Sequence, residues 1–345
     1  MAKTRRIFLS DIHLSSSELY QLKKPSTWYL PEKHQARLLG FLDGYVLAGK
    51  GEIKDVILLG DIFNTWICPA DMRPPTYASI VRSNRAVIAA FKRIIRSGIN
   101  LFYVNGNHDF DLRREEIQAR IEGIRAVKYY RSGRIHAEHG HRHDIYNRPD
   151  FISDPAFGRP IGYFISRLTA TAGEEGPTLL DLPAYLDDVL EAADTSQTIF
   201  ASIIEAMAER AGMQDSHTIT LPERRKLTVA EVKERYERLS AVYSIRELVS
   251  DLYERRYLHA SADRLCAQQD FNIVVFGHTH NALVDKDWFL VEHRIYANTG
   301  SWCKDKAYCV EIDKSPAPEA PIVVRLLRIG DDGVVLNRTC EQLAP

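Results

Sequence analysis

Short apolar runs and helical stretches alternate along the first part of the chain. Four runs rich in branched residues are closed by glycine or polar residues and therefore predict buried strands. They cover Arg6 to Ser10, Asp55 to Leu59, Asn100 to Val104 and Phe271 to Phe276. Apolar residues recur at helical spacing from His34 to Ala48 and from Ala78 to Ser97. This alternation predicts an α/β layered sheet.

Residues 151–265 differ from this pattern, because helical periodicity dominates and strand signals are few. Thr228 and Glu231 form a capping-box pattern, which predicts the start of a long charged helix. The segment begins with apolar residues, namely Ile161, Tyr163, Phe164, Ile165 and Leu168. These side chains suit packing against the segment's own helices, and they also suit a hydrophobic pocket or a contact with a membrane surface.

After Gly300 the pattern is of strands alone, at Ala307 to Ile312 and Ile322 to Ile329. We therefore expect residues 1–150 and 266–345 to form one core. Residues 151–265 would then be a helical insertion that serves as a lid or as a docking surface for a partner.

Composition narrows the functional class only slightly. The chain has 345 residues, of which 45% are hydrophobic and 26% charged, and its formal net charge is -1. These values are typical of a soluble globular protein and give no support to nucleic-acid binding. The five cysteines include no CxxC pair, so we expect neither disulfides nor a thiolate zinc site. No window approaches the roughly 20 apolar residues of a membrane span, which favours a cytoplasmic protein.

The candidate chemistry lies at the ends of the four predicted strands. Each strand is followed at once by Asp, Asn or His, at Asp11-x-His13, Asp61, Asn107-His108-Asp109 and His278-x-His280. Ligand sites of open α/β sheets lie beyond the carboxyl ends of the strands, so these clusters should converge in one crevice. Asp-x-His alone is more often structural and Gly-Asp alone is almost uninformative, whereas Gly-Asn-His-Asp and Gly-His-Thr-His are moderately specific. The four together indicate a site.

The residue types suit a pair of divalent cations. Carboxylate, amide oxygen and imidazole together favour manganese, iron or zinc over calcium or copper. Residues two apart in an extended segment share a face, as in Asp11-x-His13 and His278-x-His280. Asp61 has two carboxylate oxygens, which can bridge metals roughly 3.5–4 Å apart.

In these clusters the chain resembles the calcineurin-like metallophosphoesterase superfamily, whose motif blocks it carries in order. They stand here as Asp11-Ile12-His13, Gly60-Asp61, Gly106-Asn107-His108-Asp109, His139-Gly140-His141 and Gly277-His278-Thr279-His280. The resemblance implies a four-layer αββα metallophosphoesterase sandwich, interrupted here by the helical insertion, with a dinuclear metal site at its top.

The resemblance also implies a role for each matching residue. The first metal would be held by Asp11, His13, Asp61 and His280, and the second by Asp61, Asn107, His139 and His278. His108 would contact the phosphate and stabilise or protonate the leaving oxygen, while Asp109 would orient the ring of His108. We expect His141, Asp144 and Arg113 to contact the substrate or to support the ligands, although a purely structural role is an equal alternative for the first two.

The implied reaction is hydrolysis of a phosphomonoester, a phosphodiester or a pyrophosphate. Two cations, with manganese expected before iron or zinc, would stabilise a bridging hydroxide that attacks phosphorus in line. The expected substrate is a phosphorylated small molecule or a lipid-linked nucleotide.

Two alternatives stay open. The segments Phe8-Leu9-Ser10-Asp11 and Gly60-Asp61-Ile62-Phe63 resemble the UDP-2,3-diacylglucosamine pyrophosphatase branch, which would imply a lipid precursor as substrate. That branch usually has Arg at the position of His108. The second alternative is a non-catalytic, metal-binding scaffold for protein partners.

Overall fold

The computed structural model describes residues 3–22, 27–173, 199–240, 242–243, 247, 258–269, 271–286, 293–315, 317 and 320–343. The predicted insertion at 151–265 is therefore covered only in part, and its residues 174–198, 241, 244–246 and 248–257 lie outside the described chain. Within the described residues, no helix is both long and apolar enough to cross a membrane.

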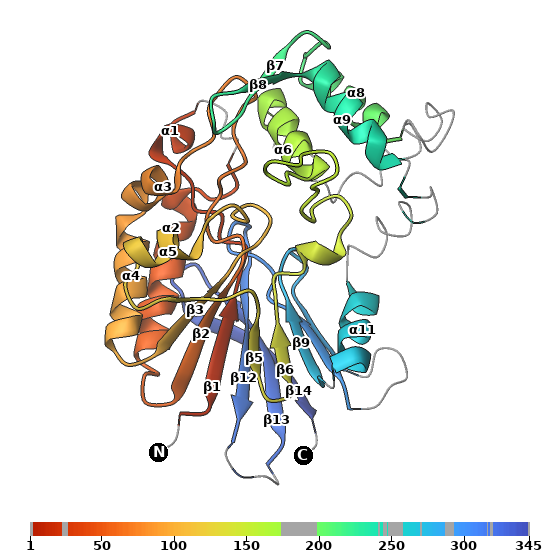
Figure 1. The fold of residues 1–345 in the computed structure, drawn as a ribbon. Helices are drawn as coiled ribbons and strands as arrows, with labels where there is room; N and C mark the ends of the chain where they lie inside the picture. Colours follow the sequence, from red (N-terminus) through yellow and green to blue (C-terminus); the bar gives the residue numbers. More distant parts are fainter. Residues whose placement is uncertain are drawn as a thin grey trace.

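Two sheets form the centre of the molecule (Figure 1). The larger sheet has seven strands in the order β14 (Val335–Leu343), β13 (Ile322–Ile329), β12 (Ala307–Lys314), β1 (Arg5–Leu9), β2 (Ile53–Leu59), β3 (Asn100–Val104) and β4 (Arg125–Ala126). The smaller has five in the order β10 (Leu283–Lys286), β11 (Ile295–Asn298), β9 (Ile273–Phe276), β6 (Ile135–Ala137) and β5 (Tyr130–Ser132). Strands β1, β2 and β3 run parallel, and so do β6, β9 and β11.

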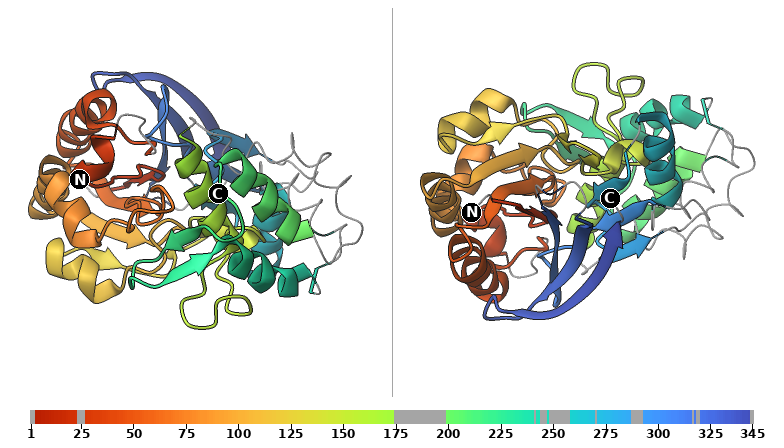
Figure 2. Two further views of the ribbon diagram at one scale, coloured as in Figure 1. Left: turned by 90° about the horizontal axis from the view of Figure 1, so that it is seen from above. Right: turned by 90° about the horizontal axis from the view of Figure 1, so that it is seen from below.

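Alternation of side chains along these strands builds three apolar layers. On β2, Val56 and Leu58 face one cluster while Ile57 and Leu59 face another. The first cluster lies under helices α2 (Pro31–Phe41) and α4 (Arg85–Arg96), and the second lies between the sheets. A third cluster lies under α11 (His259–Gln269), on the outer face of the smaller sheet. The fold is thus an αββα sandwich, as the sequence predicted (Figure 2).

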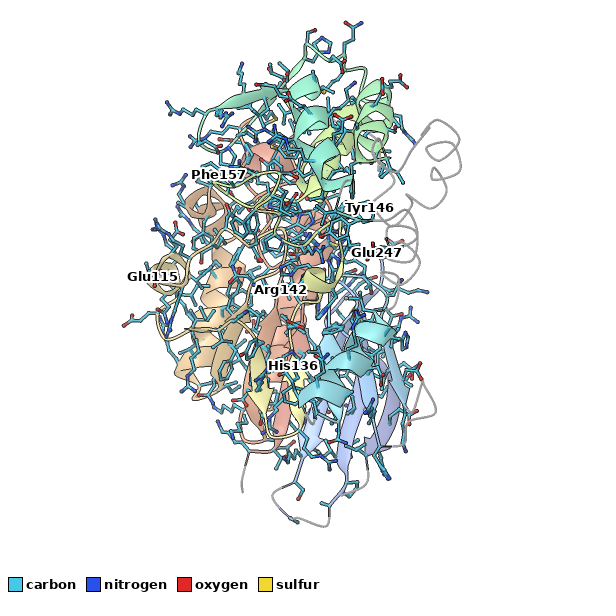
Figure 3. The ribbon with its side chains drawn as sticks, turned by 45° about the vertical axis from the view of Figure 1, so that its right-hand side comes forward. Glu115, His136, Arg142, Tyr146, Phe157 and Glu247 are labelled. Atoms are coloured by element: carbon cyan, nitrogen blue, oxygen red, sulfur yellow. The ribbon has the colours of Figure 1, made fainter. Side chains whose placement is uncertain are left out.

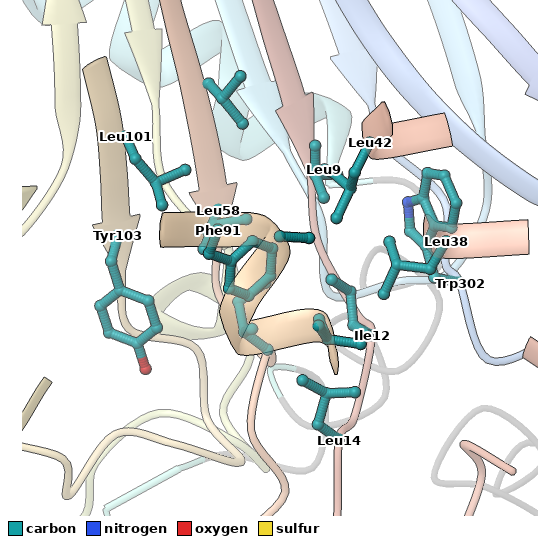
Figure 4. Close-up of a cluster of buried hydrophobic side chains, with 14 of the residues drawn as sticks. Leu9, Ile12, Leu14, Leu38, Leu42, Leu58, Phe91, Leu101, Tyr103 and Trp302 are labelled. Carbon is teal, nitrogen blue, oxygen red and sulfur yellow. The ribbon is translucent and has the colours of Figure 1, made fainter. Parts of the chain in front are cut away.

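The first of these clusters is shown in Figure 4, where Leu9, Leu58 and Leu101 of three parallel strands pack towards Phe91 of α4. Trp302, which is 1% exposed, closes the cluster beside Leu38 and Leu42. Because the strands are buried on both faces, their carboxyl ends are held at fixed positions at one edge of the sandwich.

The strand predictions agree closely with the observed elements, but two helix predictions need correction. Ala78 to Ser97 is not one helix, because α3 (Tyr77–Ser83) and α4 are separated at Asn84. Asn84 has non-helical backbone angles (φ -118°, ψ 38°), and its side-chain Nδ2 donates to the carbonyls of Ser15 (2.7 Å) and Ile80 (2.8 Å). His34 to Ala48 is likewise divided into α2 and the π-helix η1 (Leu42–Leu47).

The described part of residues 151–265 forms a cap above the sheets (Figure 1). It contains α6 (Ile161–Ala172), α8 (Ile199–Arg210), α9 (Val229–Ser240) and a two-stranded sheet of β7 (Thr218–Thr220) and β8 (Lys226–Thr228). The capping box is confirmed, since Thr228 N donates to Glu231 Oε2 (2.7 Å) and Glu231 N donates to Thr228 Oγ1 (3.1 Å). The β7–β8 pair was not predicted, because its strands are only three residues long.

The remaining helices are short or lie at the sandwich edge, namely α1 (Ser17–Tyr20), α5 (Arg114–Arg120) and η2 (His141–His143). Helix α11 crosses the predicted boundary at residue 265 and packs on β9 through Ala262 and Cys266. The division of the chain into core and insertion stays a prediction.

The apolar start of the insertion is buried inside the cap, with each of its five predicted residues at most 1% exposed. Their cluster includes Phe200, Tyr236 and also Trp66 from the loop that follows β2. Figure 3 shows Tyr146, another member, between the sheets and the cap helices. These side chains therefore form the core of the cap and do not offer an exposed membrane contact.

Candidate metal centre

The predicted ligands share an unusual backbone conformation. Five of the eight non-glycine residues with positive φ in the described chain are predicted ligands, namely Asp11 (54°), His13 (57°), Asp61 (52°), His278 (68°) and His280 (57°). The left-handed region costs about 1–2 kcal/mol per residue for most side chains. Such strain clusters at functional sites, where the surrounding structure imposes it. Here it turns side chains from separate strand ends towards one point.

Two glycines permit the close approach of these strand ends. A Cβ at Gly106 would overlap the carboxylate of Asp61, and a Cβ at Gly277 would overlap Ser10 and lie 2.7 Å from Asp11 Oδ2. Any larger residue at either position would push a predicted ligand aside. Both glycines therefore serve the packing of the site.

The first cluster joins the ends of β1, β2 and β9. His280 Nε2 lies 3.0 Å from Asp11 Oδ1 and 3.3 Å from His13 Nε2. His13 Nε2 lies 3.9 Å from both Asp11 Oδ1 and Asp61 Oδ2. All four side chains are at most 5% exposed. Burial raises the pKa of Asp11, but His280 and His139 outweigh it and lower that pKa to about 2.

The second cluster joins the ends of β2, β3, β6 and β9. His139 Nδ1 donates to the carbonyl of Leu59 (2.9 Å), so its Nε2 faces Asp61 Oδ2 (3.2 Å) and Asn107 Oδ1 (3.2 Å). Donor atoms of Asp61, His139 and His278 all lie within 4.8 Å of one another. Burial lowers the pKa of His139, but Asp61 and Asp11 reverse this and raise it to about 9. The pocket thus favours positive charge beside Asp61.

A hydrogen-bonded chain supports the ligands of this second cluster. Asp144 Oδ2 lies 2.8 Å from His278 Nε2 and accepts from Asn147 Nδ2 at 2.7 Å. Asn107 Nδ2 donates in turn to Asn147 Oδ1 (3.4 Å), which turns the Asn107 oxygen towards His139. An outer carboxylate on a ligating imidazole fixes the ring and its tautomer. Asp144 has this position, whereas Asn147 was not singled out from the sequence.

His108 lies beside the first cluster, and aromatic rings surround its imidazole. Its ring centroid is 4.7 Å from that of Trp66, 4.8 Å from that of His13 and 5.3 Å from that of Trp28. Burial lowers the pKa of His108 to about 4, with Asp61 opposing. The ring is therefore a neutral imidazole near pH 7, because its pKa lies below the ordinary histidine value of about 6.5.

The predicted role of Asp109 needs correction. Its Oδ2 accepts from the amides of Ile62 (2.9 Å) and Phe63 (3.1 Å), and its Oδ1 accepts from the amide of Gly106 (2.6 Å). Within the described chain His108 Nδ1 has no hydrogen-bond partner, so Asp109 does not orient this ring. The carboxylate turns towards the backbone because the loops after β2 and β3 expose unpaired amides there.

The two other candidates are placed differently. His141 is 2% exposed, and its ring centroid lies 5.5 Å from that of His139 and 6.5 Å from that of His278. Neither of its ring nitrogens has a hydrogen-bond partner among the described residues. Arg113 does not join the cluster. Its side chain is 78% exposed and pairs with Glu116 at the start of α5, so we find no support for substrate contact.

Two further residues reach the site without having been predicted to do so. Trp28 lies with its ring centroid 4.5 Å from that of His13 and 5.3 Å from that of His280. Cys303 has its sulfur within 4.8 Å of donor atoms of His13 and His280. Both lie in irregular segments outside any motif block, and no local pattern points to them.

The donor set fits a pair of divalent cations. Carboxylates and imidazoles converge there at short distance, and Asp11 Oδ1 is a buried oxygen with no hydrogen-bond partner in the described chain. Buried polar atoms are rarely left unpaired in proteins. Asp61 faces both clusters, through His13 and through His139. This arrangement suits two cations with Asp61 between them.

Solved structures similar to the chain include a predicted phosphoesterase from Streptococcus pneumoniae, at 12% identity and TM-score 0.35, covering 100% of this chain and 99% of that one. Another is a mutant of Vps29 from Entamoeba histolytica, at 11% identity and TM-score 0.36, covering 99% and 98%. A 5'-nucleotidase precursor from Thermus thermophilus has 11% identity and TM-score 0.29, covering 99% and 54%. Scores this low carry no argument about function.

No curated protein matches the chain. The model of the calcineurin-like phosphoesterase family matches residues 4–165, which include the blocks from Asp11 to His141. His278 and His280 lie beyond the matched region, and the structure brings them to the same cluster. Residues 4–165 are thus similar to the calcineurin-like phosphoesterase family.

Proposed function

We propose that this protein is a phosphoester hydrolase that uses two divalent cations. The observation that carries the proposal is the convergence of Asp11, His13 and His280 on one side of Asp61, with His139 on its other side. The family match supports phosphoester hydrolysis as the reaction class. Cations bound there would supply Lewis acidity towards water and towards the phosphoryl oxygens.

The chain's own residues then have defined tasks. Asp61 accepts the amide of His108 through Oδ1 (2.8 Å), which leaves Oδ2 facing His13 and His139. The hydrogen bond from His139 Nδ1 to Leu59 keeps Nε2 directed at the same point. The second cation would be held by Asp61, Asn107, His139 and His278, with Asp144 and Asn147 holding two of these side chains in place.

His108 would act on the substrate as a neutral imidazole. Its pKa lies far below 7, so it would donate a hydrogen bond to the leaving oxygen and would not deliver a full proton at neutral pH. Trp66 and Trp28 flank the ring and limit the entry of water. Both would also contact whatever group is attached to the phosphate.

A hydrolysis assay with manganese-loaded protein tests the proposal. A simple phosphomonoester, a simple phosphodiester and UDP-2,3-diacylglucosamine are compared at matched concentrations. We expect turnover of at least one of them and its loss on chelation. Bound metal without turnover on any of the three would contradict hydrolysis and favour a metal-binding scaffold.

A further inference from the structure

Cys303 occupies a position that the motif blocks leave unexplained. It follows β11 in sequence, and its side chain is among the buried ones, at 8% exposed. Its sulfur and ring nitrogens of His13 and His280 all lie within 4.8 Å of one another. A thiol here therefore faces two of the three side chains that converge on the first cation position.

The segment that carries Cys303 is fixed to the strand ends of the site. Asn298 Nδ2 donates to the carbonyl of Gly277 (2.7 Å), and the amide of Thr299 donates to the carbonyl of Phe276 (2.9 Å). The amide of Trp302 donates to the carbonyl of Asp11 (3.0 Å), and its indole is held in the apolar cluster. The position of the thiol is thus determined by the same contacts that hold the ligands.

A second observation points to a cation at this place. Asp11 Oδ1 is fully buried and has no hydrogen-bond partner in the described chain, although His280 Nε2 lies 3.0 Å away. A carboxylate oxygen and two imidazole nitrogens directed at one point are a donor set that suits a cation. Cys303 adds a soft sulfur donor to that set.

We propose that Cys303 is a thiolate ligand of the cation held by Asp11, His13 and His280, and that it biases this position towards zinc or iron(II) over manganese. The inference rests on the proposed function, because it concerns one of the same two cation positions. On binding, the thiol releases its proton to solvent and a metal–sulfur bond forms, with no change of oxidation state. Thiolate ligands select such metals, whereas carboxylates and water suit manganese.

Cobalt(II) substitution tests the proposal directly. Full-length protein freed of metal is titrated with cobalt, and its absorption is recorded. We expect a thiolate-to-cobalt charge-transfer band in the near ultraviolet for the wild type. Cys303→Ala should abolish this band while the visible bands of bound cobalt remain. Cys309→Ala is the matched control, because Cys309 is also buried in the apolar cluster under α2 and α4 but, unlike Cys303, has no donor atoms of His13 and His280 beside its sulfur, and it should keep the band.

Competition between zinc and manganese gives a second reading. Loss of a residue that hydrogen-bonds to a metal ligand lowers metal affinity by about 10–100-fold. Removal of Cys303 itself should lower the affinity for zinc by at least as much. The affinity for manganese should change little. Cys303→Ser serves the same purpose if the alanine variant does not fold.

The outcomes separate the two proposals. Bound cobalt in the wild type without the charge-transfer band, or a band that survives in Cys303→Ala, would overturn the thiolate ligand and leave the metal-dependent hydrolase intact. A wild-type protein that binds no cobalt, zinc or manganese would overturn both.

Discussion

The metal centre and the contact between the cap and the sandwich both bury charged side chains, but they differ in how many of the buried polar atoms have hydrogen-bond partners. In the cap, the guanidinium of Arg167 is 0% exposed and donates to the backbone carbonyls of Cys68, Pro69, Ala70, Met72 and Thr220. In the metal centre, Asp11 Oδ1, His13 Nδ1 and both nitrogens of His141 have no hydrogen-bond partner among the described residues.

This difference in hydrogen bonding indicates that the buried charge of Arg167 has a structural role and that the buried charges of the metal centre have a functional role. A buried polar group costs several kcal/mol unless it is paired, and proteins pair nearly all of them. Arg167 is fully paired, so its surroundings are complete without a ligand. Under the proposed function, the donors at the strand ends are completed by a cation. We therefore expect substitutions at the metal centre to affect activity, and those at Arg167 to affect stability.

The largest effect on activity is expected for Asp61→Asn. The substitution removes the charge shared by both clusters and keeps an oxygen that can accept from the amide of His108. Loss of a general acid or base lowers the rate by at most about 10⁴-fold, and we expect the rate of hydrolysis to fall by more than this. We also expect bound metal to be lost. Steady-state kinetics and elemental analysis measure the two effects. Full activity with both metals bound would show that Asp61 is not their bridge.

His108→Ala should separate substrate chemistry from metal binding. We expect turnover to fall by about 10²–10⁴-fold, because the leaving oxygen loses its hydrogen-bond donor, while the metal content stays unchanged. His136→Ala is a suitable control, since His136 is 2% exposed on β6 and stacks on Phe271 away from the cluster. Loss of metal from His108→Ala would show that this residue is a ligand instead.

Arg167→Met should have the opposite profile. It leaves five backbone carbonyls without their shared donor, and breaking a buried charged network costs about 3–5 kcal/mol. We expect the urea midpoint of unfolding to fall accordingly, while the metal content of the folded fraction does not change. Arg167→Lys should recover part of the stability. An unchanged midpoint would mean that the cap contributes little to the stability of the sandwich.

Sequence and structure agree best where a residue's role follows from its place on a strand. Asp11 and Asp61 could be predicted to converge, because each comes directly after a buried strand and parallel neighbours end at one edge, whereas His278 follows β9 of the other sheet and reaches them through the packing of the two sheets. Asp109 shows the limit of this reasoning. Its adjacency to His108 suggested a contact between the two side chains, but the backbone turns the carboxylate towards the amides of Ile62 and Phe63.

Residues whose contacts are distant in sequence have no local sequence pattern from which their role could be predicted. Cys303 reaches His13 only because the segment after β11 crosses back over the ends of β1 and β9. The partners of Arg167 are backbone carbonyls, which any residue type supplies, so the cap's attachment could not be predicted from composition or spacing. Helical periodicity predicted the cap helices themselves, because it depends on neighbours within one turn.

The smallest of the expected effects concerns Asp144. This residue tests the difference between buried charges that stabilise the fold and buried charges that serve the metal centre. It is paired, through His278 Nε2 (2.8 Å) and Asn147 Nδ2 (2.7 Å), yet it belongs to the metal centre. Asp144→Asn keeps the shape of the side chain and weakens its hold on the imidazole. We expect metal affinity to fall by about 10–100-fold, as for other outer partners of ligating histidines, and we expect activity to be restored by excess metal.

Metal titration followed by kinetics at saturating metal distinguishes this role from the alternatives. Asn147→Ala is the companion variant, because it releases the amide of Asn107 and leaves His278 paired with Asp144. If excess metal does not restore activity in Asp144→Asn, then Asp144 acts on the substrate. If instead the urea midpoint falls as far as in Arg167→Met with metal affinity unchanged, then its pairing is structural and the division between the two regions does not hold.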